Sequence, residues 1–119
     1  MKGQSLFRRM GFALAGLRAA FQREASFRTH LMATAVVLLV LAVTRASIIW
    51  WAIGVLTIGL VLAAELLNSA LETLADHVHP DRHPEIRAMK DMAAAAVLIA
   101  SIAALVVAAL YLLGGDSGP

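Results

Sequence analysis

Three long stretches without Asp, Glu, Lys or Arg dominate the hydropathy pattern of the chain. Residues 46–64 carry none over 19 positions, residues 92–115 none over 24, and residues 29–44 none over 16, although they include His30. A helix needs about 20 apolar residues to cross the hydrocarbon core of a bilayer. Basic residues at the ends of a shorter segment can extend towards the interfaces. The pattern predicts three transmembrane helices, over residues 29–46, 47–70 and 91–113.

The first 28 residues follow an amphipathic pattern instead. Apolar side chains recur at helical spacing and form one stripe: Leu6, Met10, Leu14, Leu17 and Phe21. A basic amphipathic helix before a first span typically lies in the membrane interface, and we expect this of residues 1–28. The alternative is an anchor that only sets orientation. Glu24 falls within the apolar stripe. Because a carboxylate facing lipid is costly, we expect Glu24 to face protein, a metal ion or a ligand.

Composition supports a membrane protein. Of the 119 residues, 61% are hydrophobic and 15% charged, and the mean hydropathy is +0.80. Soluble domains are usually about 45–50% apolar and about 25% charged. We therefore predict a single-domain, all-α membrane protein with one interfacial helix and three transmembrane helices. The absence of cysteine excludes disulfides, thiolate metal sites and cysteine nucleophiles.

Basic residues are distributed unevenly among the segments that connect the predicted spans. Six precede the first span and three lie between the second and third, whereas only Arg45 lies between the first and second. Cytoplasmic segments of membrane proteins are enriched in Lys and Arg, which places the N-terminus and the 77–88 loop in the cytoplasm. No spacing in this loop matches a tetrahedral metal site, so we interpret its histidines as solvated. Residues 114–119 are predicted to be a disordered tail.

A stripe of polar residues begins in the second span. Glu65, Asn68, Glu72 and Asp76 are spaced i, i+3, i+7 and i+11, and therefore fall within about 80° of one helix face. Ionisable residues inside a membrane are costly and usually functional. The alternative is helix packing, in which Glu65 and Asn68 only hydrogen-bond neighbouring helices. Packing needs one polar residue, whereas four are aligned here, so the stripe favours a functional site.

Lys90 and Asp91 are expected to begin the third span, level with the cytoplasmic end of the second. With Glu24, they would bring several carboxylates and a lysine to one membrane depth. Converging carboxylates suit Mg²⁺ that also binds phosphates, and a lysine can neutralise phosphate oxygens. A further carboxylate could accept a proton from a lipid hydroxyl. The sequence contains no Walker A motif and no kinase Gly-rich loop, so phosphoryl transfer here would use a different scaffold.

Three segments, "GLRAAFQREASFR", "AELLNSALETLAD" and "AMKDMAAAAVLIA", carry a specific resemblance. In their order and spacing the chain resembles the prokaryotic diacylglycerol kinase family of small integral membrane lipid kinases, from about Gly11 to the third span. The combination E-x-x-N-S-A-x-E followed by K-D-M is its most specific part. The resemblance implies a homotrimer in the bacterial inner membrane with active sites shared between protomers. It also implies MgATP-dependent phosphorylation of a lipid alcohol, with ATP and a membrane lipid as partners and no nucleic acid.

The resemblance assigns a role to each matching position. Glu65 matches the general base, Asn68 belongs to the same catalytic motif, and Glu24 and Glu72 match the pair that coordinates the metal. The positions matching nucleotide-binding residues are Asp81, Arg82, His83, Lys90 and Asp91. The positions matching residues that contact the lipid are Glu65 and, in the interfacial helix, Leu14, Arg18, Ala19, Ala20 and Phe21. Two positions depart from the family pattern: some members have tryptophan in place of Leu14 and a nucleotide-contacting arginine in place of Ser5.

The resemblance leaves two lipid substrates. We expect diacylglycerol, which would give phosphatidic acid, because this is the family's main activity. Undecaprenol is the alternative, because "SFRTHL" and "HPDRHP" look closer to the branch that phosphorylates it. A more distant hypothesis is a non-catalytic membrane assembly or small transporter, whose buried carboxylates would bind protons or cations. Only a kinase would transfer phosphate from ATP in response to a lipid alcohol.

Overall fold

The computed structural model describes residues 3, 5–78 and 83–115, and within them the chain forms only helices. In chain order these are α1 (Leu6–Arg23), α2 (Ala25–Val43), α3 (Ile48–Val78) and α4 (Pro84–Leu110), followed by a π-helical turn, η1 (Tyr111–Gly115). Three helices are long and apolar enough to cross a membrane: Ala25–Val43, Ile48–Val78 and Pro84–Gly114. The prediction of an all-α protein with three apolar helices suited to spanning a membrane is confirmed.

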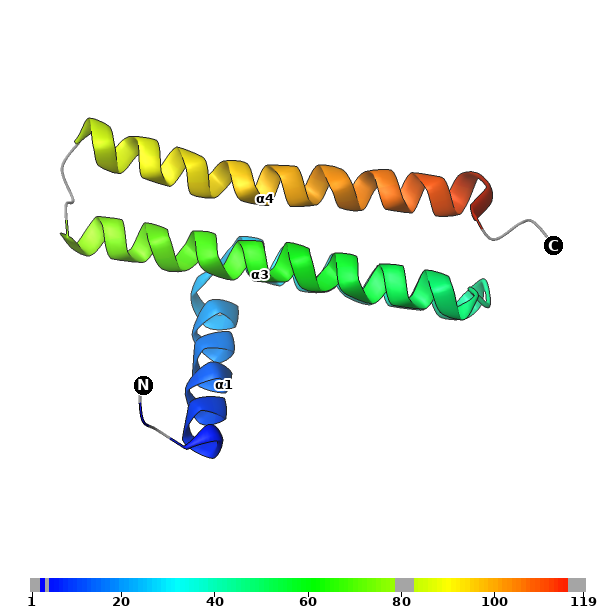
Figure 1. Ribbon diagram of the computed structural model, residues 1–119, viewed down its shortest axis with the longest axis horizontal. Helices are drawn as coiled ribbons and strands as arrows, with labels where there is room; N and C mark the ends of the chain where they lie inside the picture. The colour runs from blue at the N-terminus through cyan, green and yellow to red at the C-terminus, as the bar shows by residue number, and fades with distance from the viewer. Residues whose placement is uncertain (1–2, 4, 79–82, 116–119) are drawn as a thin grey trace.

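The long helices lie together, and α1 projects from their side at a point part-way along their length (Figure 1). α3 and α4 run side by side and antiparallel along their length, and α2 packs on α3, behind it in this view. α1 projects away from the side of the bundle and contacts α2 near its own end. Large apolar side chains remain exposed along every helix, among them Phe7, Val36, Leu56 and Leu105. A lipid environment accommodates such a surface, whereas water would not.

The boundary between α1 and α2 falls at Glu24, and not at residue 28 as the amphipathic pattern indicated. Glu24 is extended, with φ −111° and ψ 108°, and its N–H donates to the Ala20 carbonyl at 2.9 Å. Arg28 then donates from Nη1 to the Phe21 carbonyl at 2.6 Å, so the last turn of α1 is capped from α2. No proline or glycine marks this bend, which is why periodicity continued through it. Glu24 therefore leaves the apolar stripe of α1 and lies at the joint.

The α2–α3 turn is tight and tied to the end of α4. Arg45 is left-handed, with φ 54°, and the Ala46 N–H donates to the Leu41 carbonyl at 3.0 Å, as in a Schellman cap. Thr44 shares a hydrogen bond with the Tyr111 hydroxyl. The Tyr111 ring also meets Trp50 edge-to-face at 5.1 Å between centroids. One aromatic side chain thus joins the ends of all three apolar helices.

At the other end, α3 extends to Val78 and α4 begins at Pro84. The connection between the two helices is therefore shorter than the predicted 77–88 loop, and the third apolar helix begins at Pro84 and not at Lys90. Pro84 lies at the first position of α4, where proline needs no backbone N–H, and His83 caps the helix by accepting from the Glu85 N–H at 3.1 Å. His79, and residues 116–119 of the predicted tail, lie outside the described residues.

Candidate active site

Glu65 is the buried centre of the site. It lies in the middle of α3 and is 3% exposed, and it is the one buried charged residue in the part of the chain that the structure describes. Both its carboxylate oxygens face α2: the Ser26 hydroxyl donates to Oε1, and His30 Nδ1 lies 3.6 Å from Oε2. An ionised group in an apolar bundle is expensive unless it is partnered, and α2 supplies the partners.

Asn68 lies one turn further along α3, and its side-chain oxygen, unlike those of Glu65, has no partner in the described residues. Its Oδ1 is buried and accepts no hydrogen bond within the described residues. Such an atom costs about 1–3 kcal/mol when unsatisfied. The packing hypothesis predicted that both Glu65 and Asn68 would bond to neighbouring helices, and in this chain only Glu65 does so. Asn68 Oδ1 is therefore a ready acceptor for a ligand or for another protomer.

The joint between α1 and α2 brings Glu24 to the same face of α3. Its Oε1 lies 3.4 Å from the Ser69 hydroxyl, which donates to it, so the carboxylate faces protein as expected. Glu72 is exposed, three residues beyond Ser69 and hence about one turn along α3. The fold thus brings the Glu24 carboxylate to α3 within about one helical turn of Glu72. Within the described residues, no three His, Asp or Glu side chains are grouped to hold a metal by themselves.

Lys90 lies beside the far end of the stripe. Its Nζ pairs with Asp76 Oδ1 at 2.9 Å, while Asp91 pairs with Arg87 at 3.4 Å between exposed side chains. At 1.5 Å per residue, Asp76 is about 16 Å along α3 from Glu65. The expectation that the carboxylates and the lysine share one membrane depth is therefore corrected: they are spread along a strip. Asp81 and Arg82, predicted to bind nucleotide, lie outside the described residues.

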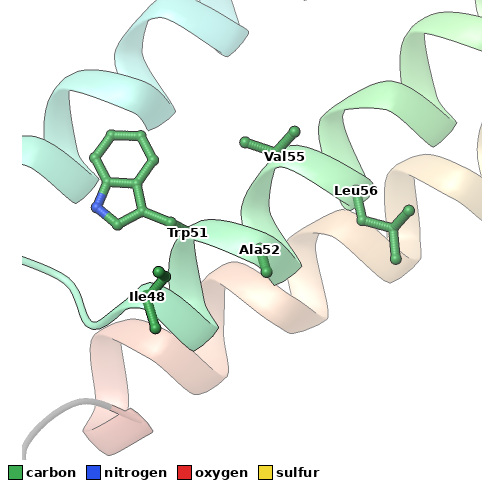
Figure 2. A pocket seen from close by; sticks show the side chains of 5 residues that line it. All are labelled: Ile48, Trp51, Ala52, Val55 and Leu56. Atoms are coloured by element: carbon green, nitrogen blue, oxygen red, sulfur yellow. The ribbon is translucent and has the colours of Figure 1, made fainter.

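Apart from Glu65, the residues predicted to contact lipid lie between the middle of α1 and its end at the joint. Ala20 is buried and Ala19 partly buried, whereas the remaining three are exposed: Leu14, Arg18 and Phe21. This half of α1 offers an apolar surface beside the Glu24 joint. A shallow groove on the first turns of α3 is not a candidate active site, because its lining is apolar and contains no acid or base (Figure 2).

Sequence reasoning missed Ser26 and His30. The resemblance assigned site residues to α1, α3 and α4, and it used the start of α2 only to compare the two substrate branches. One signal was present: Ser26 and His30 are spaced i, i+4, which puts both polar side chains on one face of α2. Which residue they would meet depended on how α2 packs.

Residues 11–112 match the family described as prokaryotic diacylglycerol kinase. The chain belongs to this family. It is similar to a diacylglycerol kinase of Pseudomonas aeruginosa, at 38% identity over 117 residues that cover 95% of each chain. It is also similar to a diacylglycerol kinase of Escherichia coli K12, at 34% identity over 81% of this chain and 79% of the relative.

A third relative is named for a different activity. An undecaprenol kinase of Bacillus subtilis is 34% identical over 98 residues, which cover 82% of this chain and 80% of the relative. Membership of the family makes the protein a lipid kinase, a phosphotransferase, and decides against the transporter hypothesis. The matched segment includes every predicted site residue, from Leu14 to Asp91.

Proposed function

We propose that the protein transfers the γ-phosphate of MgATP to the hydroxyl of diacylglycerol, giving phosphatidic acid. The observation that carries the proposal is Glu65, a buried carboxylate held by α2 and bordered by an unpartnered amide oxygen at Asn68. A lipid alcohol reaching this depth needs a base of this kind, because its hydroxyl must lose a proton as the new bond forms. General-base assistance is worth about 10²–10⁴-fold in rate.

In the proposed reaction, Glu65 accepts the hydroxyl proton while the lipid oxygen bonds to the γ-phosphorus. The bond from that phosphorus to the β-phosphate oxygen breaks, and ADP leaves. Lys90, already paired with a carboxylate at 2.9 Å, can exchange that partner for phosphate oxygens. The strip from Asp76 to Glu65, about 16 Å long, suits an elongated nucleotide lying along α3.

Mg²⁺ fits the donors that the joint provides. Glu24 and Glu72 offer hard carboxylate oxygens, and Mg²⁺ in nucleotide sites is usually held by one or two carboxylates together with phosphates. When bound there, the ion would neutralise charge on the phosphate oxygens. We further propose that the N-terminus and the α3–α4 connection face the cytoplasm of a bacterial inner membrane, since nine of ten basic residues lie on that side.

We also propose a homotrimer with active sites shared between protomers. Three spanning helices are too few to enclose the strip, and Glu72 and Asp76 are exposed in the single chain. Carboxylates at membrane depth are disfavoured against lipid, so a neighbour is needed to cover them. The open Oδ1 of Asn68 supports the same conclusion.

The test is a phosphoryl-transfer assay in mixed micelles with Mg·ATP, offering diacylglycerol and undecaprenol side by side. The proposal expects the higher kcat/KM with diacylglycerol. Undecaprenol is the second candidate, supported by the similarity to the Bacillus subtilis enzyme. A higher kcat/KM with undecaprenol would make undecaprenol the preferred substrate in place of diacylglycerol.

Glu65→Gln tests the assigned base. The variant should keep its fold and nucleotide binding but lose most turnover, by about 10²–10⁴-fold. Glu85→Gln is a matched control, because Glu85 is exposed in the first turn of α4 and outside the proposed site. Wild-type turnover in a correctly assembled Glu65→Gln protein would remove Glu65 from the mechanism.

A further inference from the structure

Two α2 side chains lie against the Glu65 carboxylate on one side. Ser26 and His30 are four residues apart and therefore one turn apart on the same face of α2. Each lies next to a different carboxylate oxygen: the Ser26 hydroxyl donates to Oε1, and His30 Nδ1 lies 3.6 Å from Oε2. Within the described residues, neither oxygen has a further side-chain hydrogen bond or ion pair.

The two contacts are not equally complete. His30 Nδ1 is buried and has no hydrogen-bond partner in the described residues, although the imidazole side chain as a whole is 25% exposed. Its distance to Glu65 Oε2 is slightly longer than the 2.7–3.2 Å typical of an N–H···O bond. Hydrogen bonds of catalytic groups are often long in unliganded structures and shorten when substrate binds. Closing this gap would also satisfy a buried nitrogen.

Helix packing alone does not account for the arrangement. Thr34 lies one further turn along the same face of α2, and its hydroxyl donates to the His30 carbonyl of its own helix at 2.8 Å. The polar contacts that reach from α2 to α3 are therefore concentrated on one carboxylate. A single hydroxyl would be enough to satisfy one oxygen of Glu65 as helix–helix glue. The second group, on the second oxygen, fixes orientation.

We propose that His30 is a positioning residue for Glu65, which together with Ser26 fixes the plane of the carboxylate that receives the substrate proton. This inference rests on the proposed function. The terminal torsion of a glutamate is broad and roughly two-fold, so a carboxylate held by one oxygen can still turn. Held by both oxygens, it presents its remaining lone pairs in one direction.

Loss of this orientation should reduce the chemical step more than nucleotide binding. A misplacement of about 1 Å can cost about 10²-fold in rate. We expect His30→Leu to lower kcat by about ten- to hundredfold, while the KM for ATP stays within about twofold. Ser26→Ala should lower kcat in the same direction. Thr34→Val is the control, since it removes a hydroxyl from the same helix face that does not contact Glu65, and its kcat should be unchanged.

A conservative pair of variants separates positioning from a merely structural role. The side-chain amide of asparagine lies close to where Nδ1 of histidine lies, whereas that of glutamine extends to the Nε2 position. Because Nδ1 is the atom that faces Glu65, His30→Asn should restore kcat to within about threefold of wild type. His30→Gln should remain as low as His30→Leu. Thermal unfolding of each variant shows whether it is folded, and the Asn–Gln comparison still decides if the Leu variant is not.

The positioning role also predicts coupling to Glu65. In a Glu65→Gln background, His30→Leu should lower the residual rate no further, because the group that it orients no longer acts as a base. A wild-type kcat in His30→Leu, equal losses in the Asn and Gln variants, or a full additional loss in the double variant would overturn the proposal. These outcomes presuppose an active wild-type enzyme. If the wild-type protein transfers phosphate to no lipid alcohol, the proposed function fails first and the positioning role fails with it.

Discussion

Gly54 determines how closely α2 and α3 approach, and replacing it tests this packing. Gly54 is buried in α3, and a Cβ atom built on it would lie 2.9 Å from Leu41 Cδ1 of α2. Carbon atoms in favourable contact are about 3.5–4.0 Å apart, so Gly54→Ala is short of space by about 0.6 Å. Leu41 is itself 4% exposed, and it can give way only by disturbing its own packing.

The expected magnitude follows from two opposing terms. Overpacking of this kind costs about 1–3 kcal/mol, whereas replacing a helix glycine by alanine returns about 0.5–1 kcal/mol. Gly54→Ala should therefore be neutral to destabilising, by about 0–2.5 kcal/mol. Gly59→Ala is the matched control on the same helix, because a Cβ there meets nothing within 4 Å. Gly59→Ala gains helix stability without overpacking, so the free energies of unfolding of the two variants should differ by the overpacking cost, about 1–3 kcal/mol.

The assay is reversible unfolding in mixed micelles, with the free energy of unfolding measured for both variants. Leu41→Val provides a second arm, because it removes the methyl group that a Cβ at Gly54 would meet. In that background Gly54→Ala should cost less than it does alone. Equal stabilities for the Gly54 and Gly59 variants would refute the close approach. So would an unchanged cost in the Leu41→Val background.

Three further predictions concern the metal, the assembly and the aromatic contact. Glu24→Ala and Glu72→Ala should each raise the free Mg²⁺ concentration needed for half-maximal activity, and unchanged midpoints in both would move the metal elsewhere. Mixing Glu24→Ala with Glu65→Gln chains should partly restore activity if sites are shared. No recovery in mixed trimers demonstrated by differential tagging would contradict sharing. Tyr111→Phe, which removes the hydroxyl bonded to Thr44, should lower the free energy of unfolding by about 0.5–1.5 kcal/mol, and an unchanged value would show that this bond is not stabilising.

The sequence by itself determined the class of protein and the helices. Uncharged runs of bilayer length predicted three spans, because a segment in hydrocarbon must satisfy its own backbone and can do so only as a helix or a closed barrel. The stripe from Glu65 to Asp76 was also visible, since α3 is continuous from Ile48 to Val78 and helical spacing keeps those residues on one face. These are local properties, fixed by spacing along one segment.

Helix ends were predicted less well, for reasons that are physical. The bend at Glu24 has no proline or glycine; it depends on Arg28 capping the last carbonyls of α1 and on the burial of Phe27, which is 3% exposed. Pro84 falls within the predicted 77–88 loop, whereas in the structure it lies at the first position of α4, where proline favours a helix start. A break that is made by contacts between helices leaves no periodic signal.

Only the tertiary structure decided what each polar residue faces. Glu65 meets Ser26 and His30 because α2 packs against that face of α3, and a sequence separation of 39 positions between Ser26 and Glu65 gives no local indication of it. Lys90 meets Asp76, and so lies about 16 Å along the strip from the buried carboxylate. Spacing fixes the face of one helix on which a side chain lies, whereas its partner depends on how two helices cross, which is set by packed contacts such as Gly54 against Leu41.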